Sequence, residues 1–169
     1  MRIIDCYLSG YVENELKRIT KEEIQNLDSI ITQLFFFAYV WAIGVTTTLE
    51  GRLKFDKYVR EQVLPKVGIE FPAEKLIYDY KFDVETKEWQ YWRDTVPEYS
   101  VDIKASYNEI LVPTVDSIRM KYLTKLLVMN NKHVLTPGPT GTGKSVNIAE
   151  LLTYELPEEY QTLAITFSA

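Results

Sequence analysis

Cysteine and histidine are nearly absent from this chain of 169 residues, and each scarcity excludes a class of site. The single cysteine, Cys6, cannot form an internal disulfide and suits a reducing compartment, where we expect a small buried apolar side chain. The single histidine, His133, cannot supply the clustered ligands of a His/Cys metal site. We therefore expect neither a disulfide-stabilised domain nor a zinc centre of this kind.

An excess of basic charge and a long apolar run are also lacking. Asp and Glu number 24 against 19 Lys and Arg, and the net charge of −5 disfavours direct binding of nucleic acid. The most apolar stretch, residues 34–45, has 12 residues, which is too short for a membrane span and typical of a buried helix. No signal peptide is visible after Met1 and Arg2. We expect a soluble or assembly-bound globular protein without a nucleic-acid or membrane partner.

The sequence does contain a phosphate-binding loop at residues 138–145, and its spacing fits G-x-x-x-x-G-K-S/T. Glycines permit positive φ angles, so that successive N–H groups form a nest for phosphate oxygens at a helix N-terminus. Lys144 is predicted to reach the β- and γ-phosphates, and the Ser145 hydroxyl to ligate Mg²⁺. The predicted nucleotide-binding residues here are Gly138, Pro139, Thr140, Gly141, Thr142, Gly143, Lys144 and Ser145.

The neighbouring segments predict a strand before this loop and a helix after it. Residues 133–136 are partly β-branched and read as a buried strand, which Pro137 shortens because proline lacks an N–H. Pro157 is predicted to end the helix, and residues 162–167 to form a second strand. The apolar residues of the predicted helix are Ile148, Ala149, Leu152 and Leu156.

Residues that would complete hydrolysis are not evident after the loop. P-loop ATPases need an acidic group at the end of a later strand to hold Mg²⁺, and a residue that orients the attacking water. None of the later acidic residues follows an apolar strand, so we expect the chain alone to bind nucleotide without hydrolysing it and assign no catalytic residue. These acidic residues are Glu150, Glu155 and the loop residues Glu158 and Glu159.

The first 72 residues predict an all-helical unit without a catalytic constellation. Apolar residues from Leu27 to Val45 recur at helical spacing, and Phe35 and Phe36 widen the stripe, so core packing is favoured over a cofactor pocket. Residues 55–63 predict a second helix, stopped by proline and glycine at positions 65 and 68. Its charged residues are expected on a solvated surface, and they are Arg52, Lys54, Lys57, Arg60 and Glu61.

Two further elements lie between this unit and the loop. Residues 76–82 and 89–92 predict the strands of a hairpin, in which Asp79 and Asp83 are expected to be surface charges rather than a carboxylate pair. Residues 108–112 predict an extended run that Pro113 stops. Thr114 then suits the N-cap of a helix with Asp116 in its first turn, and the apolar stripe of that helix is Val115, Ile118, Tyr122, Leu123 and Leu126.

Taken together, these segments resemble the dynein heavy chain, a ring-shaped AAA+ motor, over nearly the whole sequence. FFAYVWAIG at 36–44 and GRLKFD at 51–56 are similar to the lid of the second AAA+ module, and residues 78–92 to the hairpin after it. ILVPTVDSIR at 110–119 is similar to the start of the third module, and GPTGTGKS and the terminal TFSA continue the match. The third site most resembles that of axonemal inner-arm dyneins.

The resemblance implies an α/β fold in three parts. These are a helical AAA+ lid (residues 1–72), a β-hairpin connector (73–93) and the incomplete N-terminal part of a P-loop AAA+ three-layer sandwich (94–169). It also implies that Val112, Pro113 and Thr114 line the adenine side of a pocket for ATP or ADP with Mg²⁺. Because the first two strands of an AAA+ sheet are not neighbours, both should lack partners here, and we expect the sequence to be part of a longer polypeptide.

The resemblance further implies an ATP-driven, minus-end-directed microtubule motor of the cytoskeleton and the ciliary axoneme. The third site would be regulatory, gating the force-producing cycle at the first. The remaining catalytic residues would lie beyond Ala169 or across the ring. The implied partners are the rest of the heavy-chain ring, dynein intermediate and light chains, and a microtubule bound through a distant stalk.

Other interpretations of the loop stay open. A self-contained P-loop kinase or small NTPase would need an acidic strand end and a lid after the loop, which 24 residues cannot supply. A nucleotide-binding scaffold or degenerate fragment would hold nucleotide without hydrolysis, and nucleotide would only rigidify its helices. The glycine-rich turn could also match the motif by chance in a structural protein.

Overall fold

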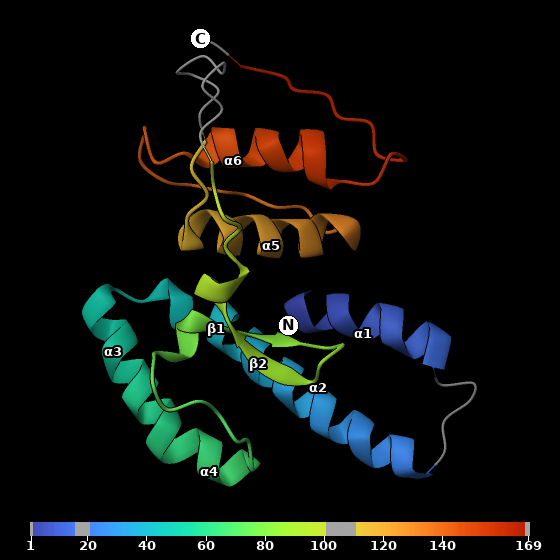
Figure 1. Ribbon diagram of the computed structural model, residues 1–169, viewed down its shortest axis with the longest axis vertical. Coiled ribbons are helices and arrows are strands. Elements are labelled where there is room, and N and C mark those ends of the chain that lie inside the picture. The colour runs from blue at the N-terminus through green and yellow to red at the C-terminus, as the bar shows by residue number, and fades with distance from the viewer. Residues whose placement is uncertain (1, 16–20, 101–110, 168–169) are drawn as a thin grey trace. The chain divides into compact units, whose positions relative to one another are not determined.

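A computed structural model describes residues 2–15, 21–100 and 111–167, and the chain divides into two compact units, Met1–Glu98 and Tyr99–Ala169 (Figure 1). The first unit consists of helices with one small antiparallel sheet, and the second contains two main helices joined by the phosphate loop. The helices of the first unit are α1 (Arg2–Glu15), α2 (Lys21–Ala42), α3 (Leu49–Tyr58) and α4 (Leu64–Val67), with a 3-10 turn at Gly44–Thr46 and a π-helical turn at Val59–Val63.

Helix α2 is the centre of the first unit, and its predicted apolar stripe is confirmed. Leu34, Phe37 and Ala38 are at most 3% exposed. Phe36 is buried and widens the stripe as predicted, but the same prediction is wrong for Phe35, which is 53% exposed. Its apolar segment is longer than the sequence suggested, since residues 27–46 could cross a membrane by length and composition alone. These buried side chains identify α2 as a core helix. Cys6 of α1 is buried as well, as expected for a small apolar residue.

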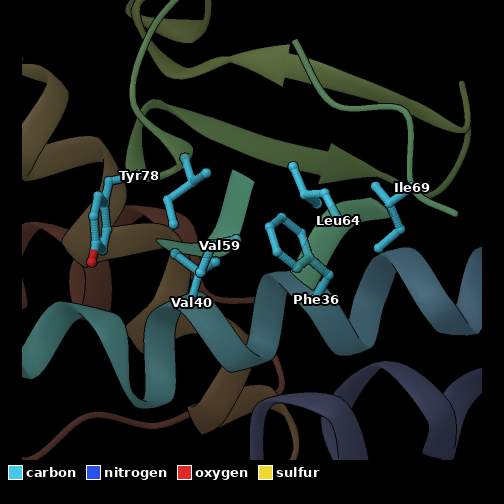
Figure 2. Packing of buried hydrophobic residues seen from close by; sticks show 7 residues of the cluster. Phe36, Val40, Val59, Leu64, Ile69 and Tyr78 are labelled. Atoms are coloured by element: carbon cyan, nitrogen blue, oxygen red, sulfur yellow. The ribbon is translucent and has the colours of Figure 1, made fainter. Parts of the chain in front are cut away.

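The main hydrophobic cluster joins α2 to the segments that follow it. Figure 2 shows side chains from α2, the π-helical turn and the start of the hairpin region pointing toward one another. A smaller cluster packs Phe82 of the hairpin against Ile30 and Leu34 of α2. The aromatic residues therefore fill a core. The buried members of the main cluster are Phe36, Val40, Val59, Leu64, Ile69, Ile77 and Tyr78.

Asp56 and Arg60 tie α3 and the π-helical turn to a distant segment. The Arg60 guanidinium donates from Nε to the Asp56 carboxylate at 3.1 and 3.2 Å, and from Nη1 to the Pro72 carbonyl at 2.8 Å. It also donates to the Lys75 carbonyl. Asp56, only 9% exposed, accepts a further bond of 2.8 Å from the Ile77 N–H. This network fixes the chain just before the hairpin.

The expectation that all charged residues of this helix are solvated is wrong for two of them. Arg60 is paired with Asp56 and stacks over the Phe71 ring at 5.3 Å. Arg52 donates to the Val45 carbonyl at 3.2 Å and lies over the Tyr78 ring. Long aliphatic stems let arginine cover apolar surface while its planar head bonds carbonyls, which helical spacing alone does not reveal.

The second predicted helix is longer than expected. Helix α3 begins six residues before Phe55, with Thr48 at its N-cap accepting a bond from the Gly51 N–H at 3.3 Å. Pro65 does not stop the helical path, because it occupies the first turn of α4, where its missing N–H is not needed. The path ends at Gly68, as predicted, and the φ of Gly68 is left-handed at 68°.

The hairpin is confirmed but is shorter than predicted. Strands β1 (Tyr80–Asp83) and β2 (Glu88–Tyr91) are antiparallel, with Phe82 opposite Trp89. Residues 77–79 form a 3-10 turn instead of extending β1, and the Asp79 carboxylate accepts from the Leu76 N–H at its start. A second 3-10 turn, Trp92–Thr95, follows β2.

Asp83 has a structural role in the hairpin turn. Its Oδ1 accepts bonds from the N–H groups of Thr86 and Glu85 at 3.1 and 2.9 Å. The hydrogen bond from the Thr86 backbone lowers the pKa of Asp83 below its ordinary value, and burial opposes this effect. Asp79 and Asp83 therefore hold turns, and neither behaves as a simple surface charge or as a catalytic pair.

In the second unit, α5 (Val115–Met129) precedes the phosphate loop and α6 (Lys144–Glu150) follows it. A π-helical turn at Leu151–Glu155 extends α6, so the helical path ends two residues before Pro157. Leu151 is fully buried, whereas Ala149 of the predicted stripe is exposed. On α5 the predicted apolar residues are half-buried, and Thr124 is the residue that is buried.

The two predicted strands of the second unit are wrong within the part of the chain that the structure describes. Residues 133–136 and 162–167 pair with no described strand. A strand needs a neighbouring strand to complete its hydrogen bonds, so these segments do not form strands here. Leu135, Leu163 and Phe167 are 88%, 83% and 93% exposed, which matches the expectation of unpartnered segments. The predicted extended run at 108–112 lies outside the described residues up to position 110.

We predict that Asp56→Ala loosens the segment before the hairpin. The change removes the acceptor of the Ile77 N–H and leaves a partly buried Arg60 without its carboxylate. Hydrogen exchange of the Ile77 amide in the heavy chain should accelerate about tenfold or more, as expected for a lost hydrogen bond to a charged group. Glu61→Ala is the control, because Glu61 is exposed and should leave exchange unchanged. Equal exchange in both variants would contradict the role of Asp56.

Candidate functional site

The phosphate loop turns sharply into α6, and two of its glycines are left-handed. Gly141 has a φ of 80° and Gly143 a φ of 74°, with Gly143 at the N-cap position of α6. A positive φ was also expected at Gly138, but the φ of Gly138 is not positive. Gly138 instead provides space, since a Cβ there would lie 3.2 Å from Lys144 Cδ. The loop thus has the backbone shape that the motif predicts at its second half.

Lys144 lies across its own loop. Its Nζ donates to the Thr142 hydroxyl at 2.9 Å and to the Pro139 carbonyl. The Thr142 hydroxyl in turn donates to the same Pro139 carbonyl at 3.0 Å. The ammonium group is therefore placed against the loop backbone, beside Gly138. A cation and the first N–H groups of α6, both of which attract phosphate oxygens, therefore adjoin the loop.

Ser145, the predicted magnesium ligand, is exposed near the start of α6. Among the described residues, no group of three or more His, Cys, Asp or Glu is placed to hold a metal ion by itself. A magnesium ion here would therefore take its ligands from Ser145, nucleotide oxygens and water, which is how this ion commonly binds in phosphate sites. The arrangement fits Mg²⁺ that arrives with a nucleotide.

A pocket of about 280 Å³ lies where the predicted adenine-side residues meet α6. Val112, Pro113 and Thr114 form one wall, although they precede the first residue of the loop, Gly138, by 24 to 26 positions. The other wall consists of Gly143, which was predicted as a binding residue, and of three α6 residues to which the sequence analysis gave no binding role, Val146, Asn147 and Glu150. Their spacing of i, i+3, i+4 and i+7 from Gly143 could have revealed them as one helix face. The full lining is Leu111, Val112, Pro113, Thr114, Ser117, Gly143, Val146, Asn147 and Glu150.

Both walls of this pocket are held by helix-terminal hydrogen bonds. Thr114 caps α5 as predicted: its hydroxyl accepts from the Ser117 N–H at 3.1 Å, and Ser117 Oγ accepts from the Thr114 N–H at 2.9 Å. On α6, Asn147 Nδ2 donates to the Gly143 carbonyl at 2.9 Å. These bonds fix the two chain turns that face each other across the pocket.

Lys121 joins α5 to the helix that follows the loop. Its Nζ is 3.2 Å from Glu150 Oε2 and 2.8 Å from Glu155 Oε1, and its side chain is only 12% exposed. Burial alone would lower the pKa of Lys121, but the hydrogen bonds that Lys121 donates to the carboxylates of Glu155 and Glu150 outweigh burial and raise the pKa above the ordinary value. Sequence reasoning gave none of these three residues a role, because their contact depends on how two helices pack.

A glycine-rich loop at a helix N-terminus, with a lysine across it and a pocket beside it, defines the class of P-loop nucleotide-binding proteins. Family comparison narrows this class. Residues 1–94 match the dynein heavy chain AAA lid domain, and residues 99–169 match the P-loop containing dynein motor region. The chain belongs to the dynein heavy chain family.

Curated relatives agree with this assignment. The chain is 33% identical over 187 residues to dynein axonemal heavy chain 1 of Mus musculus, a match that covers 100% of this chain. It is 31% identical over 166 residues to dynein axonemal heavy chain 2 of Homo sapiens, covering 97% of this chain. The chain spans 4% of the length of each of these relatives. The family resemblance is confirmed, while the module and the inner-arm type stay predictions.

We predict that Glu155→Gln lowers the pH at which Lys121 becomes reactive toward an acylating reagent. A raised pKa in the folded chain means that the ion pair is complete below the ordinary lysine value, about pH 10.4, and is lost as pH rises through the folded pKa. Removing one carboxylate weakens that effect. Mass spectrometry of acylated peptides across pH would measure the midpoint. An unchanged midpoint would contradict the Glu155 contact, and Glu159→Gln, in an exposed loop, is the control.

Proposed function

We propose that the chain contributes the nucleotide-binding half of the third site in the AAA+ ring of a dynein heavy chain. The supporting observation is the pocket that brings Val112, Pro113 and Thr114 to the helix leaving the phosphate loop. A loop for phosphates and a partly apolar pocket beside it are the two parts that a nucleoside triphosphate needs. The ligands are ATP or ADP with Mg²⁺.

Each residue then has a defined task. The N–H groups of residues 138–145 cradle phosphate oxygens, and Lys144 exchanges the Pro139 carbonyl and Thr142 hydroxyl for the β- and γ-phosphates. Ser145 orients Mg²⁺ at the same end of α6. Val112 and Pro113 pack against the base, while the cap at Thr114 holds their segment in place.

The proposal places this site in an ATP-driven microtubule motor of the ciliary axoneme, of inner-arm type. Residues 133–136 and 162–167 become paired strands of a three-layer sandwich once the rest of the module supplies their neighbours. The site regulates the force-producing cycle at the first module. Its partners are the remaining ring, intermediate and light chains, and a microtubule bound through a distant stalk.

Nucleotide binding without hydrolysis is the activity we propose for these residues alone. Of the acidic residues after Ser145, Glu150 and Glu155 pair with Lys121, and Glu158 and Glu159 are in an exposed loop. None is placed as the acidic strand end that a P-loop ATPase uses. This arrangement is also what favours the second candidate, a nucleotide-binding scaffold, over a self-contained kinase.

We predict that Lys144→Ala abolishes nucleotide binding at this site. The full-length heavy chain would be photo-labelled with 8-azido-ATP, and mass spectrometry would quantify labelled peptides from residues 111–119 and 145–155, which separates this site from others in the chain. Loss of the charge that faces the phosphates should reduce labelling at least about tenfold. Lys132→Ala, also a lysine of the second unit, is the control. Unchanged labelling in Lys144→Ala would contradict the proposed function.

We also predict that Ser145→Ala removes the increase in nucleotide binding caused by Mg²⁺, while the loop still binds the phosphates. The change deletes a metal ligand and leaves the loop backbone and Lys144 in place. In the same labelling assay, Mg²⁺ should increase labelling of the unaltered chain several-fold, whereas the variant should label equally with Mg²⁺ and with EDTA. A full response of the variant to Mg²⁺ would exclude Ser145 as a ligand.

A further inference from the structure

We propose that Glu150 selects the base at this site by accepting a hydrogen bond from the exocyclic amino group of adenine. The inference rests on the proposed nucleotide site and deepens it. It assigns specificity to a residue outside the phosphate loop and outside the segment 112–114. Among the described residues that line the pocket, Glu150 is the one that carries an ionisable side chain.

The position of Glu150 along α6 suits contact with a base. Gly143, Val146, Asn147 and Glu150 share one face of the helix and line the same pocket. With a rise of about 1.5 Å per residue, Glu150 is about 10 Å along the axis from Gly143. The phosphates belong to the loop end of this face, because Lys144 and the first N–H groups of α6 are there. A nucleotide extended from that end directs its base toward Glu150.

The other polar side chains of the pocket are each tied to a helix terminus by at least one hydrogen bond. The Thr114 and Ser117 hydroxyls accept the cap bonds of α5, and the Asn147 amide donates to the Gly143 carbonyl. Val112, Pro113 and Val146 add apolar surface. The pocket thus combines apolar walls, suited to the face of a purine, with one carboxylate suited to its edge.

The Lys121 contact determines which purine edge the Glu150 carboxylate can accept a hydrogen bond from. Lys121 Nζ lies 3.2 Å from Glu150 Oε2, which orients the carboxylate and offsets its charge near an anionic nucleotide. Oε1 remains as an acceptor. One acceptor suits the single amino group on the adenine edge, whereas the two adjacent N–H donors of guanine are best matched by both oxygens of a carboxylate. A carbonyl in place of the amino group would face an acceptor with another acceptor.

The experiment compares ATP with ITP, in which a carbonyl replaces the amino group. Each competes with 8-azido-ATP for labelling of peptides from residues 111–119 and 145–155 in the full-length heavy chain, and half-inhibitory concentrations give the ITP/ATP ratio. We expect a ratio of at least about ten in the unaltered chain and within about threefold of one in Glu150→Gln. A glutamine amide can present either an oxygen or an NH₂ group to the base, so ATP still binds.

Matched variants separate base selection from helix packing. Glu155→Gln removes the charge of the other Lys121 partner but keeps an oxygen that can accept from Lys121 Nζ, and Glu155 does not line the pocket. Glu159→Gln changes an exposed acid. Both should keep the ratio of the unaltered chain. The proposal is overturned if ITP competes as well as ATP in the unaltered chain, or if Glu150→Gln keeps the ITP/ATP ratio of the unaltered chain or loses ATP labelling. It is also overturned if Glu155→Gln lowers the ITP/ATP ratio as much as Glu150→Gln does. Failure of Lys144→Ala to reduce labelling would instead reject the nucleotide site itself.

Discussion

The contact of Lys121 with Glu150 and Glu155 is the constraint on which the geometry of the second unit depends. Helix α5 begins at Val115, after the N-cap residue Thr114, and α6 begins at Lys144, at the end of the phosphate loop. The pocket lies between these two starting points, and Glu150 both lines it and contacts Lys121. Because Lys121 is largely buried between two carboxylates, rotation of either helix would leave a charge without its partner.

The first unit uses the same physical device at a different place. Asp56 and Arg60 bond to backbone groups from Pro72 to Ile77, and so connect a helix to the start of the hairpin. The apolar cluster in Figure 2 forms the main core of this unit, but apolar contacts have little directional preference. Charged groups with several fixed partners specify which segment packs where. In both units a basic side chain shared among oxygen acceptors sets the relative positions of segments.

Features governed by local sequence were predictable. The α2 stripe, the cap at Thr114, the hairpin turn and the left-handed residues Gly141 and Gly143 depend on neighbours within a few positions. Features governed by distant partners were not. Arg60 looked like a solvated charge because its carbonyl partners are 12 and 15 residues away. Glu150 was given no role because its partner, Lys121, lies on another helix. Strands at 133–136 and 162–167 were predicted from residue types that favour strands, but such residues form a strand only where a neighbouring strand completes the hydrogen bonds.

The exposed segment at 162–167 has a practical consequence for protein production. Its apolar residues alternate with small or polar ones, and Leu163, Ile165 and Phe167 are 83%, 62% and 93% exposed. Such a stretch combines high β-propensity with no charge and no proline, which favours edge-to-edge association between copies. A recombinant protein limited to the 169 residues of this chain will tend to precipitate during expression. Replacing Ile165 by lysine would act as a gatekeeper against that self-association.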